Sequence, residues 1–143
     1  MKLTKQVFLS YTKKQQRLGS AVARELLDRQ LDVWDAYSMP TGSPIEESIR
    51  DALKASDSMV AILDPFSFSS SRVRNELDYA LFDERYKGRL LPVFVGAKKS
   101  DFARLPWILN RFQLLRFRAT NNVERQAAKI ADTFLLLLRE SRE

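Results

Sequence analysis

Short apolar runs alternate with helical patterns along the chain, and this alternation constrains the fold more than any other feature of the sequence. Runs at residues 7–9, 31–34, 59–63, 90–95 and 112–117 have the length and composition of β-strands. Most of the segments between them place apolar residues three or four positions apart, which is the spacing of a helix with one buried face. Strands that alternate with helices form βα units, and such units build a parallel sheet.

Capping signals mark where the first two helices begin. Thr12 and Gln15 have the spacing of a capping box. Ser43, Pro44 and Glu46 give a second start, since serine suits the N-cap, proline the first helical position and glutamate the capping-box acid. The buried stripes that follow are Leu18, Val22 and Leu26 in the first helix and Ile45, Ile49, Ala52 and Leu53 in the second.

The C-terminal third has a less regular part and then a long helix. Segment 97–111 is the least regular, with Pro106 and Trp107 closing a short helix or turn. Asn121 and Glu124 cap a last helix, which contains the leucine run 135–138. That run is too short to span a membrane, so it predicts core packing.

These elements predict an α/β fold, a flavodoxin-like three-layer sandwich in which about five helices cover one five-stranded parallel sheet of strand order 2-1-3-4-5. A length of 143 residues suits one domain, and we expect it to extend over residues 1–143. Ligands of open parallel sheets bind outside the carboxyl ends of the strands, near the switch in strand order. That switch lies between the first and third strands, where the loops at 10–14, 36–42 and 64–71 are expected to meet.

The chain contains neither cysteine nor histidine, which excludes several kinds of chemistry. Disulfides, thiol nucleophiles, Ser-His-Asp catalysis and most zinc sites need thiolate or imidazole groups. We therefore expect no metal and no bound cofactor, and chemistry from carboxylate, hydroxyl, amine or guanidinium groups. No targeting signal and no apolar stretch of membrane-spanning length is found, so a soluble cytoplasmic protein is predicted.

The net charge of +6 favours an anionic partner, such as a nucleotide diphosphate, nucleic acid or an acidic protein face. The basic residues are dispersed, and no RNA-binding aromatic signature accompanies them, which argues against nucleic acid. The four glycines are too scattered for a phosphate-binding loop or a dinucleotide fingerprint.

Glu76 lies on a predicted helix that begins near Ser71. The apolar stripe of this helix is Val73, Leu77, Ala80 and Leu81. Because Glu76 lies three residues after the first of these and four before the third, its carboxylate is expected to flank the buried face. A glutamate in a helix is usually solvated, so the spacing alone leaves a surface role and a functional role open. Asp64, at the end of the third strand, is interpreted as a turn residue.

Taken together, these segments resemble a bacterial TIR (Toll/interleukin-1 receptor) domain over roughly residues 6–137. The matching stretches are 7–12 for the first-strand box, 33–42 for the second strand and the BB loop, 45–56 for the next helix and 70–76 for the helix with the catalytic glutamate. Each box is short, and the resemblance rests on their order and spacing.

The resemblance implies an NAD+ nucleosidase or ADP-ribosyl cyclase that cleaves the nicotinamide–ribose bond, with Glu76 at the position of the catalytic carboxylate. NAD+ is then the substrate, and the product is ADP-ribose or a cyclic ADP-ribose isomer. It also implies homo-oligomers formed through TIR–TIR contacts, a role in antiviral defence, and a separate effector protein that senses the product. The expected substrate-binding residues are Tyr11, Lys13, Asp35, Gly42, Ser71 and Arg72.

The chain departs from the family pattern in two places. Many enzymatic members have a tryptophan four residues before the glutamate and an aspartate in the first box, where this chain has Arg72 and Gln15. Arg72 is expected to grip a phosphate through a bidentate contact, or else it reports altered substrate geometry or lost activity. Two other functions remain open. They are a non-catalytic interaction module that acts through loop 36–42, and a nucleoside deoxyribosyltransferase-like enzyme.

Overall fold

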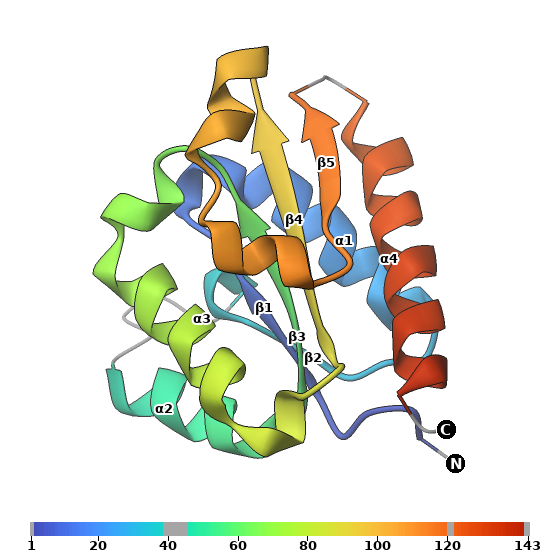
Figure 1. Cartoon of the computed structure of the whole chain (residues 1–143). Coiled ribbons are helices and arrows are strands. Elements are labelled where there is room, and N and C mark those ends of the chain that lie inside the picture. Colours follow the sequence, from blue (N-terminus) through green and yellow to red (C-terminus); the bar gives the residue numbers. More distant parts are fainter. Residues whose placement is uncertain (1, 39–45, 120–121, 142–143) are drawn as a thin grey trace.

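The computed structural model describes residues 2–38, 46–119 and 122–141, and these residues contain one parallel β-sheet. Within them the strands are β1 (Val7–Ser10), β2 (Val33–Asp35), β3 (Ser58–Leu63), β4 (Leu90–Gly96) and β5 (Leu115–Arg118). They lie in the order β2-β1-β3-β4-β5, and each neighbouring pair is parallel. The predicted five-stranded sheet and its strand order are therefore confirmed (Figure 1).

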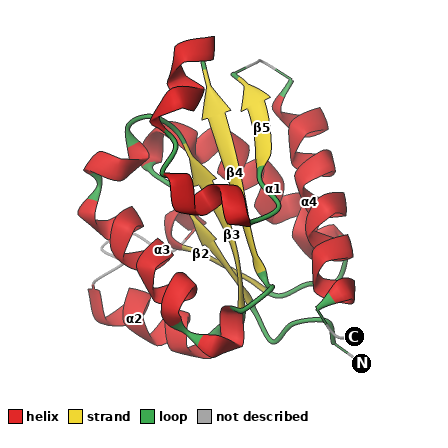
Figure 2. Cartoon of the chain, viewed as in Figure 1, coloured by secondary structure: helices red, strands yellow, loops and turns green. Residues whose placement is uncertain are grey.

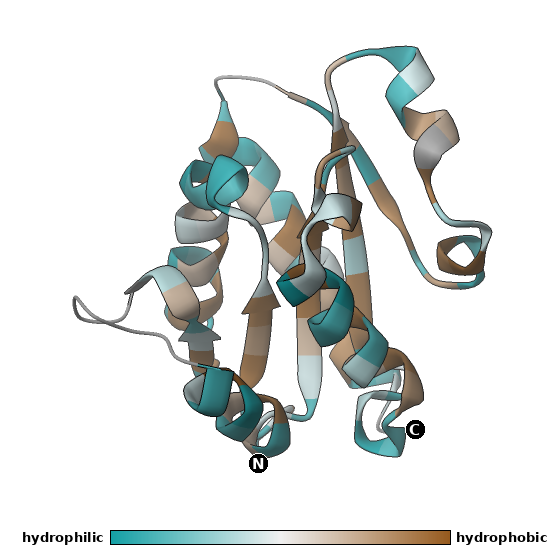
Figure 3. Cartoon of the chain, turned by 90° about the vertical axis from the view of Figure 1, so that its left-hand side faces the viewer, coloured by the Kyte–Doolittle hydropathy of each residue, from teal (hydrophilic) through white to brown (hydrophobic). Residues whose placement is uncertain are grey.

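Helices cover both faces of this sheet, as predicted for a three-layer sandwich (Figure 2). Helices α1 (Gln16–Asp28) and α4 (Val123–Glu140) share one hydrophobic core with Val60 and Ile62 of β3. Helices α2 (Glu46–Ala55) and α3 (Ser71–Phe82) share a second core with Met59, Ala61 and Leu63, the alternate residues of the same strand. Every residue of β3 and β4 is buried, as expected for strands covered on two faces, and their ribbons are mostly hydrophobic in Figure 3.

The first helix buries the predicted stripe. Leu18, Val22 and Leu26 are all within 3% of full burial. The C-terminus of this helix explains why β2 begins two residues later than predicted. The backbone N–H of Leu31 donates to Leu26 O at 3.1 Å, and Gln30 adopts the left-handed region at φ 69°. Leu31 therefore closes the helix instead of opening a strand.

The predicted capping box of α1 is wrong. Thr12 makes no side-chain cap hydrogen bond, and it precedes the 3₁₀ helix η1 (Lys13–Gln15), whereas the N-cap of α1 is Gln15. The backbone N–H of Gln15 donates to Thr12 O at 2.9 Å. The side chain of Gln15 instead reaches across the sheet edge, where its Nε2 donates to Asp64 Oδ2 at 2.8 Å.

Segment 97–111 forms two short 3₁₀ helices, η5 (Lys99–Arg104) and η6 (Trp107–Arg111). Pro106 separates them, because proline cannot continue the preceding helix. The described residues thus contain four α-helices, and the prediction of about five was one too many. Strand β5 begins at Leu115 and not at residue 112, because the N–H of Phe112 donates to Leu109 O at the end of η6.

The last helix begins one residue later than predicted. Asn122 is its N-cap, and Oδ1 accepts a hydrogen bond from Arg125 N at 3.3 Å. The predicted cap, Asn121, and the predicted helix start at 43–45 lie outside the described residues. In the leucine run, Leu138 is buried and Leu136 is 55% exposed, so only part of the run packs in the core. Among the residues that the structure describes, no helix has both the length and the apolarity that crossing a membrane requires.

Candidate active site

Helix α3 carries Glu76 into the protein interior. Ser70 is the N-cap of this helix, and its Oγ accepts a hydrogen bond from Val73 N at 3.3 Å. Its buried residues are Val73, Glu76, Leu77 and Ala80. The Glu76 side chain is 1% exposed. The sequence had predicted that the carboxylate flanks the buried face of the helix. It lies within that face instead.

Two side chains bind the Glu76 carboxylate. Ser10, at the carboxyl end of β1, donates from Oγ to Oε1 at 2.7 Å. Arg72, one helical turn before Glu76, donates from Nη1 to Oε2 at 2.7 Å and forms an ion pair with it. Each carboxylate oxygen thus accepts a hydrogen bond from a different element of the fold.

The guanidinium of Arg72 also contacts the segments that follow β1 and β2. Nη2 donates to Tyr11 O at 2.6 Å and to the Tyr37 hydroxyl at 3.3 Å. Tyr37 belongs to the 3₁₀ helix η2 (Ala36–Ser38), and the guanidinium carbon lies 5.7 Å from its ring centroid. Arg72 is engaged on both terminal nitrogens, so a grip on phosphate would first require some of these contacts to open. That role stays a prediction.

Burial raises the pKa of Glu76 above its ordinary value of 4.5. The positive charge of Arg72 and the hydrogen bonds from Ser10 and Arg72 favour the ionised form, and they offset this effect without cancelling it. A carboxylate in such surroundings is weakly hydrated, so its charge acts strongly on any cation that replaces Arg72.

Tyr11 and Asp35 form a buried support behind this pair. The Tyr11 hydroxyl donates to Asp35 Oδ1 at 2.6 Å, and that oxygen also accepts from Tyr37 N at 3.0 Å. The rings of Tyr11 and Tyr37 stack with centroids 5.0 Å apart. Burial raises the pKa of Tyr11, which keeps its hydroxyl a neutral donor. Gly19 makes room for the ring, since a Cβ there would lie 2.5 Å from it.

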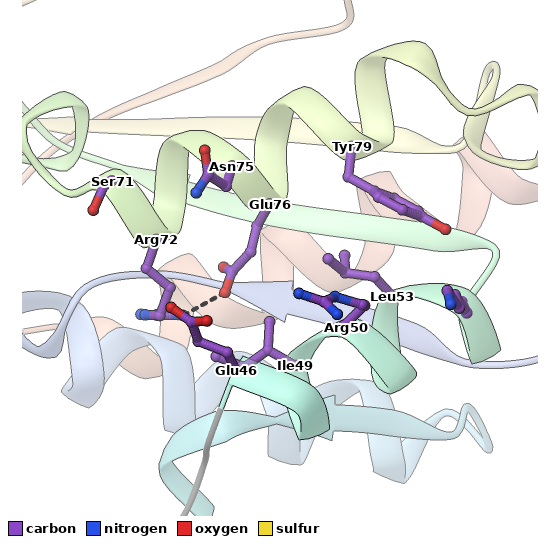
Figure 4. Close-up of a pocket in the computed structure, with 10 residues that line it drawn as sticks. Glu46, Ile49, Arg50, Leu53, Ser71, Arg72, Asn75, Glu76 and Tyr79 are labelled. Carbon is purple, nitrogen blue, oxygen red and sulfur yellow. Dashed lines mark hydrogen bonds and ion pairs between the residues drawn. The ribbon is translucent and has the colours of Figure 1, made fainter.

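A cavity of about 560 Å³ opens beside Glu76, between α2 and α3 (Figure 4). This volume lies within the range of ligand pockets, roughly 300–1,000 Å³. Glu46 and Arg50 of α2 face Arg72 and Glu76 of α3 across it. The lining residues are Glu46, Ile49, Arg50, Leu53, Lys54, Ser71, Arg72, Asn75, Glu76 and Tyr79.

The structure separates the predicted site residues into three groups. Ser71, Arg72 and Glu76 line the cavity. Tyr11 and Asp35 lie behind it, bonded to each other, and Lys13 begins η1 without lining it. Gly42 lies outside the described residues.

Several lining residues were missed from the sequence, most notably Arg50 and Lys54. A signal for both was present. Each directly follows a residue of the predicted buried stripe, Ile49 or Leu53, so both share one flank of that helix. The sequence alone does not show that this flank faces α3.

The carboxyl edge of the sheet, where loops were expected to form the site, contains a second cavity of about 660 Å³. It is lined in part by Lys14, Asp64, Phe66 and Lys98. Asp64 accepts hydrogen bonds from Phe66 N at 2.8 Å and from Ser67 Oγ at 3.2 Å, which confirms its interpretation as a turn residue. Ser10 lies at this edge, at the end of β1, and donates a hydrogen bond to Glu76, which lines the first cavity. No cluster of three or more metal-binding side chains lies within the described ranges.

The sheet and its flanking helices define the class of the protein, a flavodoxin-like α/β domain with a buried glutamate on the helix that follows the third strand. A family model described as a TIR domain matches residues 7–131, and the chain belongs to the TIR domain family. The predicted resemblance to a TIR domain is thereby confirmed.

Solved structures agree with the fold. A metazoan TIR-STING receptor from C. gigas, solved in complex with 2′,3′-cGAMP, matches 87% of this chain with a TM-score of 0.65 and 19% sequence identity. The match covers 38% of the receptor chain. A diflavin flavoprotein A3 from Nostoc sp. matches with a TM-score of 0.54 and 13% identity, covering 96% of each chain. None of the curated proteins compared with the chain is significantly similar to it.

Proposed function

We propose that this TIR domain cleaves the bond between nicotinamide and ribose in NAD+, with Glu76 as the catalytic carboxylate. One observation carries the proposal. An acidic side chain that is 1% exposed borders a cavity of about 560 Å³, and a side-chain cation is its counter-ion. Burying a carboxylate is costly, and such perturbed groups in clefts are concentrated at functional sites.

The reaction suits a site with a single carboxylate. The bond between the nicotinamide nitrogen and ribose C1′ breaks, and its electron pair stays on the nitrogen, so nicotinamide departs neutral and needs no proton. Ordinary glycosides need a second carboxylic acid for that step. Ribose then carries the positive charge, which the Glu76 carboxylate stabilises. Water adds to C1′ and loses a proton to give ADP-ribose, whereas a hydroxyl or ring nitrogen of the same molecule gives a cyclic isomer.

In this mechanism Arg72 has to yield to the substrate. Its guanidinium is paired with the carboxylate that would face the ribose cation, and Nη1 lies 2.7 Å from Glu76 Oε2. Two cations cannot share this carboxylate closely without repulsion. The ion pair therefore opens as NAD+ enters, and the released guanidinium becomes available to a phosphate oxygen.

The same ion pair favours a second candidate function, a non-catalytic TIR module that signals through TIR–TIR contacts. Arg72 ties Glu76 to Tyr37, directly before the predicted BB loop. In that case the glutamate is structural, and it holds the loop that other TIR domains would contact.

Nicotinamide release from NAD+, measured by mass spectrometry, tests the proposal. Glu76→Gln keeps the shape of the side chain and removes its charge, and we expect turnover to fall by on the order of a hundredfold or more. Asp78→Asn is the matched control, because Asp78 is an exposed acid on the same helix. Full retention of turnover in Glu76→Gln, or an equal loss in the control, would contradict the mechanism. Absence of turnover in the unaltered protein, both dilute and crowded, would favour the non-catalytic module.

Assembly and signalling extend the proposal. We expect the active form to be a homo-oligomer in which the BB loop of one chain completes the cavity of another, and the product to act on a separate effector protein in antiviral defence. Turnover per molecule should then fall on dilution. Constant specific activity over a hundredfold dilution would contradict the requirement for assembly.

A further inference from the structure

The charges that line the Glu76 cavity are unevenly placed. Glu46 and Arg72 lie at one end, whereas Tyr79 lies at the other (Figure 4). Lys54 also lines the cavity, from the last turn of α2. Glu76 and Arg72 neutralise each other at 2.7 Å. With that pair neutral, Glu46 leaves one end of the cavity acidic, and Arg50 and Lys54 make the rest of the α2 wall basic.

Arg50 and Lys54 have no ion-pair partner among the residues that the structure describes. Both are exposed, and they lie four residues apart on α2, so their side chains share one face about 6 Å apart along the helix. The guanidinium of Arg50 points into the space between α2 and α3 (Figure 4). Two neighbouring, unneutralised cations at the wall of a cavity attract a compact anion with at least two charges.

The end of α2 is fixed in place, which gives these cations a defined position. The Tyr86 hydroxyl donates to Leu53 O at 2.6 Å, and Nη1 of Arg85 donates to Lys54 O. Leu53 is 6% exposed and packs in the core shared with α3. The backbone that carries the two cations is thus anchored to η4 (Glu84–Tyr86), while their side chains stay free.

We propose that Arg50 and Lys54 form a diphosphate-binding site, so that the cavity holds a dinucleotide in one orientation. The inference rests on the proposed function for the identity of the ligand. The charges of NAD+ are complementary to those of the cavity. A cationic nicotinamide lies on one side of a ribose, and an anionic diphosphate lies on the other. The acidic end beside Glu76 receives the first group and the basic α2 wall receives the second. Arg72 becomes available to a phosphate oxygen only after NAD+ opens its pair with Glu76, so Arg50 and Lys54 are the primary phosphate ligands.

Binding measurements test the site without any need for turnover. The probes are ADP-ribose, inorganic pyrophosphate and adenosine, titrated calorimetrically at fixed ionic strength because exposed charges are screened by salt. The test variant is Arg50→Gln with Lys54→Gln. The control is Arg24→Gln with Lys129→Gln, which removes the same charge from exposed positions on α1 and α4, in the opposite layer.

We expect the test variant to bind ADP-ribose and pyrophosphate roughly tenfold to a hundredfold more weakly, since each charge-assisted hydrogen bond contributes about tenfold or more. Binding of adenosine should not change, and the control should match the unaltered protein. Equal affinity in the test variant, an equal loss in the control, or no binding of ADP-ribose by the unaltered protein would overturn the inference.

The two proposals fail in different ways. If ADP-ribose binds through Arg50 and Lys54 but no nicotinamide is released under any condition, the proposed reaction is wrong and the diphosphate site stands. If nicotinamide release depends on Glu76 while the Arg50 and Lys54 variant keeps its affinity for ADP-ribose, the reaction stands and the diphosphate site is wrong.

Discussion

The two helical layers bury different kinds of side chain against the same sheet. The buried residues of α1 and α4 are apolar or glycine, whereas α3 buries Glu76 among its apolar residues. Helix α2 buries only Ala52 and Leu53 of the residues described, and the Glu76 cavity lies along it. The layer of α1 and α4 therefore seals the sheet and is called the sealing layer. The layer of α2 and α3, called the cavity layer, leaves space beside a carboxylate.

This difference locates stability and function in separate layers. An apolar layer stabilises through area removed from water and close packing. A buried charge costs free energy, which ion pairing and hydrogen bonds offset only in part. Variants on the two sides should consequently respond to different measurements.

Phe134→Ala, in the sealing layer, should have the largest effect. Phe134 on α4 is fully buried, and deleting a buried phenylalanine side chain costs about 3–5 kcal/mol in the free energy of unfolding. Urea unfolding monitored by circular dichroism measures the loss. Leu53→Ala, beside the cavity, should cost less, because its surroundings are already incompletely packed. An equal or greater cost for Leu53→Ala would remove the proposed distinction between the layers.

Gly19→Ala, also in the sealing layer, should destabilise by about 1–3 kcal/mol through overpacking. A Cβ at residue 19 would lie 2.5 Å from the Tyr11 ring. The sign is informative, because alanine in place of glycine inside a helix otherwise stabilises by about 1 kcal/mol. Arg24→Ala, an exposed position of the same helix, is the control. A stabilised Gly19→Ala variant would show that Tyr11 moves freely and is no rigid support for the site.

Arg72→Gln should destabilise the cavity layer by about 1–2 kcal/mol at neutral pH. Removing one partner of a fully buried pair costs about 3–5 kcal/mol, and Arg72 is 30% exposed, so solvent reduces the loss. The loss should shrink as the pH falls and Glu76 becomes protonated. Thermal unfolding of Arg72→Gln, Glu76→Gln and the double variant gives the coupling between them. Additive effects would contradict the ion pair.

Glu76→Gln should have the smallest effect on stability, and its dependence on pH is the informative part. The pKa of Glu76 is raised in the folded protein, so its contribution to stability is fully present below the unfolded pKa and is lost as the pH rises through the folded value. The glutamine variant lacks this loss. Its Tm relative to the unaltered protein should therefore increase from about pH 4 to above the raised pKa, in differential scanning at several pH values. A difference that falls with pH would mean that pairing with Arg72 outweighs burial.

Much of the architecture was readable from local patterns. The strand order followed from alternating strands and helices with right-handed crossovers, and the stripe at Leu18, Val22 and Leu26 followed from helical spacing. The predicted elements were wrong where a residue had two possible hydrogen-bond partners, one near in sequence and one distant, or two possible local structures. Gln15 had the spacing of a capping box and instead donates to Asp64, a residue that is distant in sequence. Leu31 had the composition of a strand and instead closes α1.

The site was predicted in outline and not in its charge arrangement. Glu76, Arg72 and Ser71 were named from the sequence, and all three line the cavity. The ion pair at i, i+4 was within reach of sequence reasoning, because Arg72 and Glu76 share a helix face. The bond from Ser10, 66 residues away, and the opposition of Arg50 to α3 depend on how β1 and α2 pack against α3.

The sequence by itself determined the family, the parallel sheet and the exclusion of thiol and imidazole chemistry, because these follow from local periodicity, the order of short boxes and residue types. Only the tertiary structure decided that Glu76 is buried and paired, and that one helical layer leaves a cavity with an acidic end and a basic wall. The physical reason is range. Helix and strand signals act over a few residues, whereas burial, a shifted pKa and the charge of a cavity are set by elements that meet only in the folded chain.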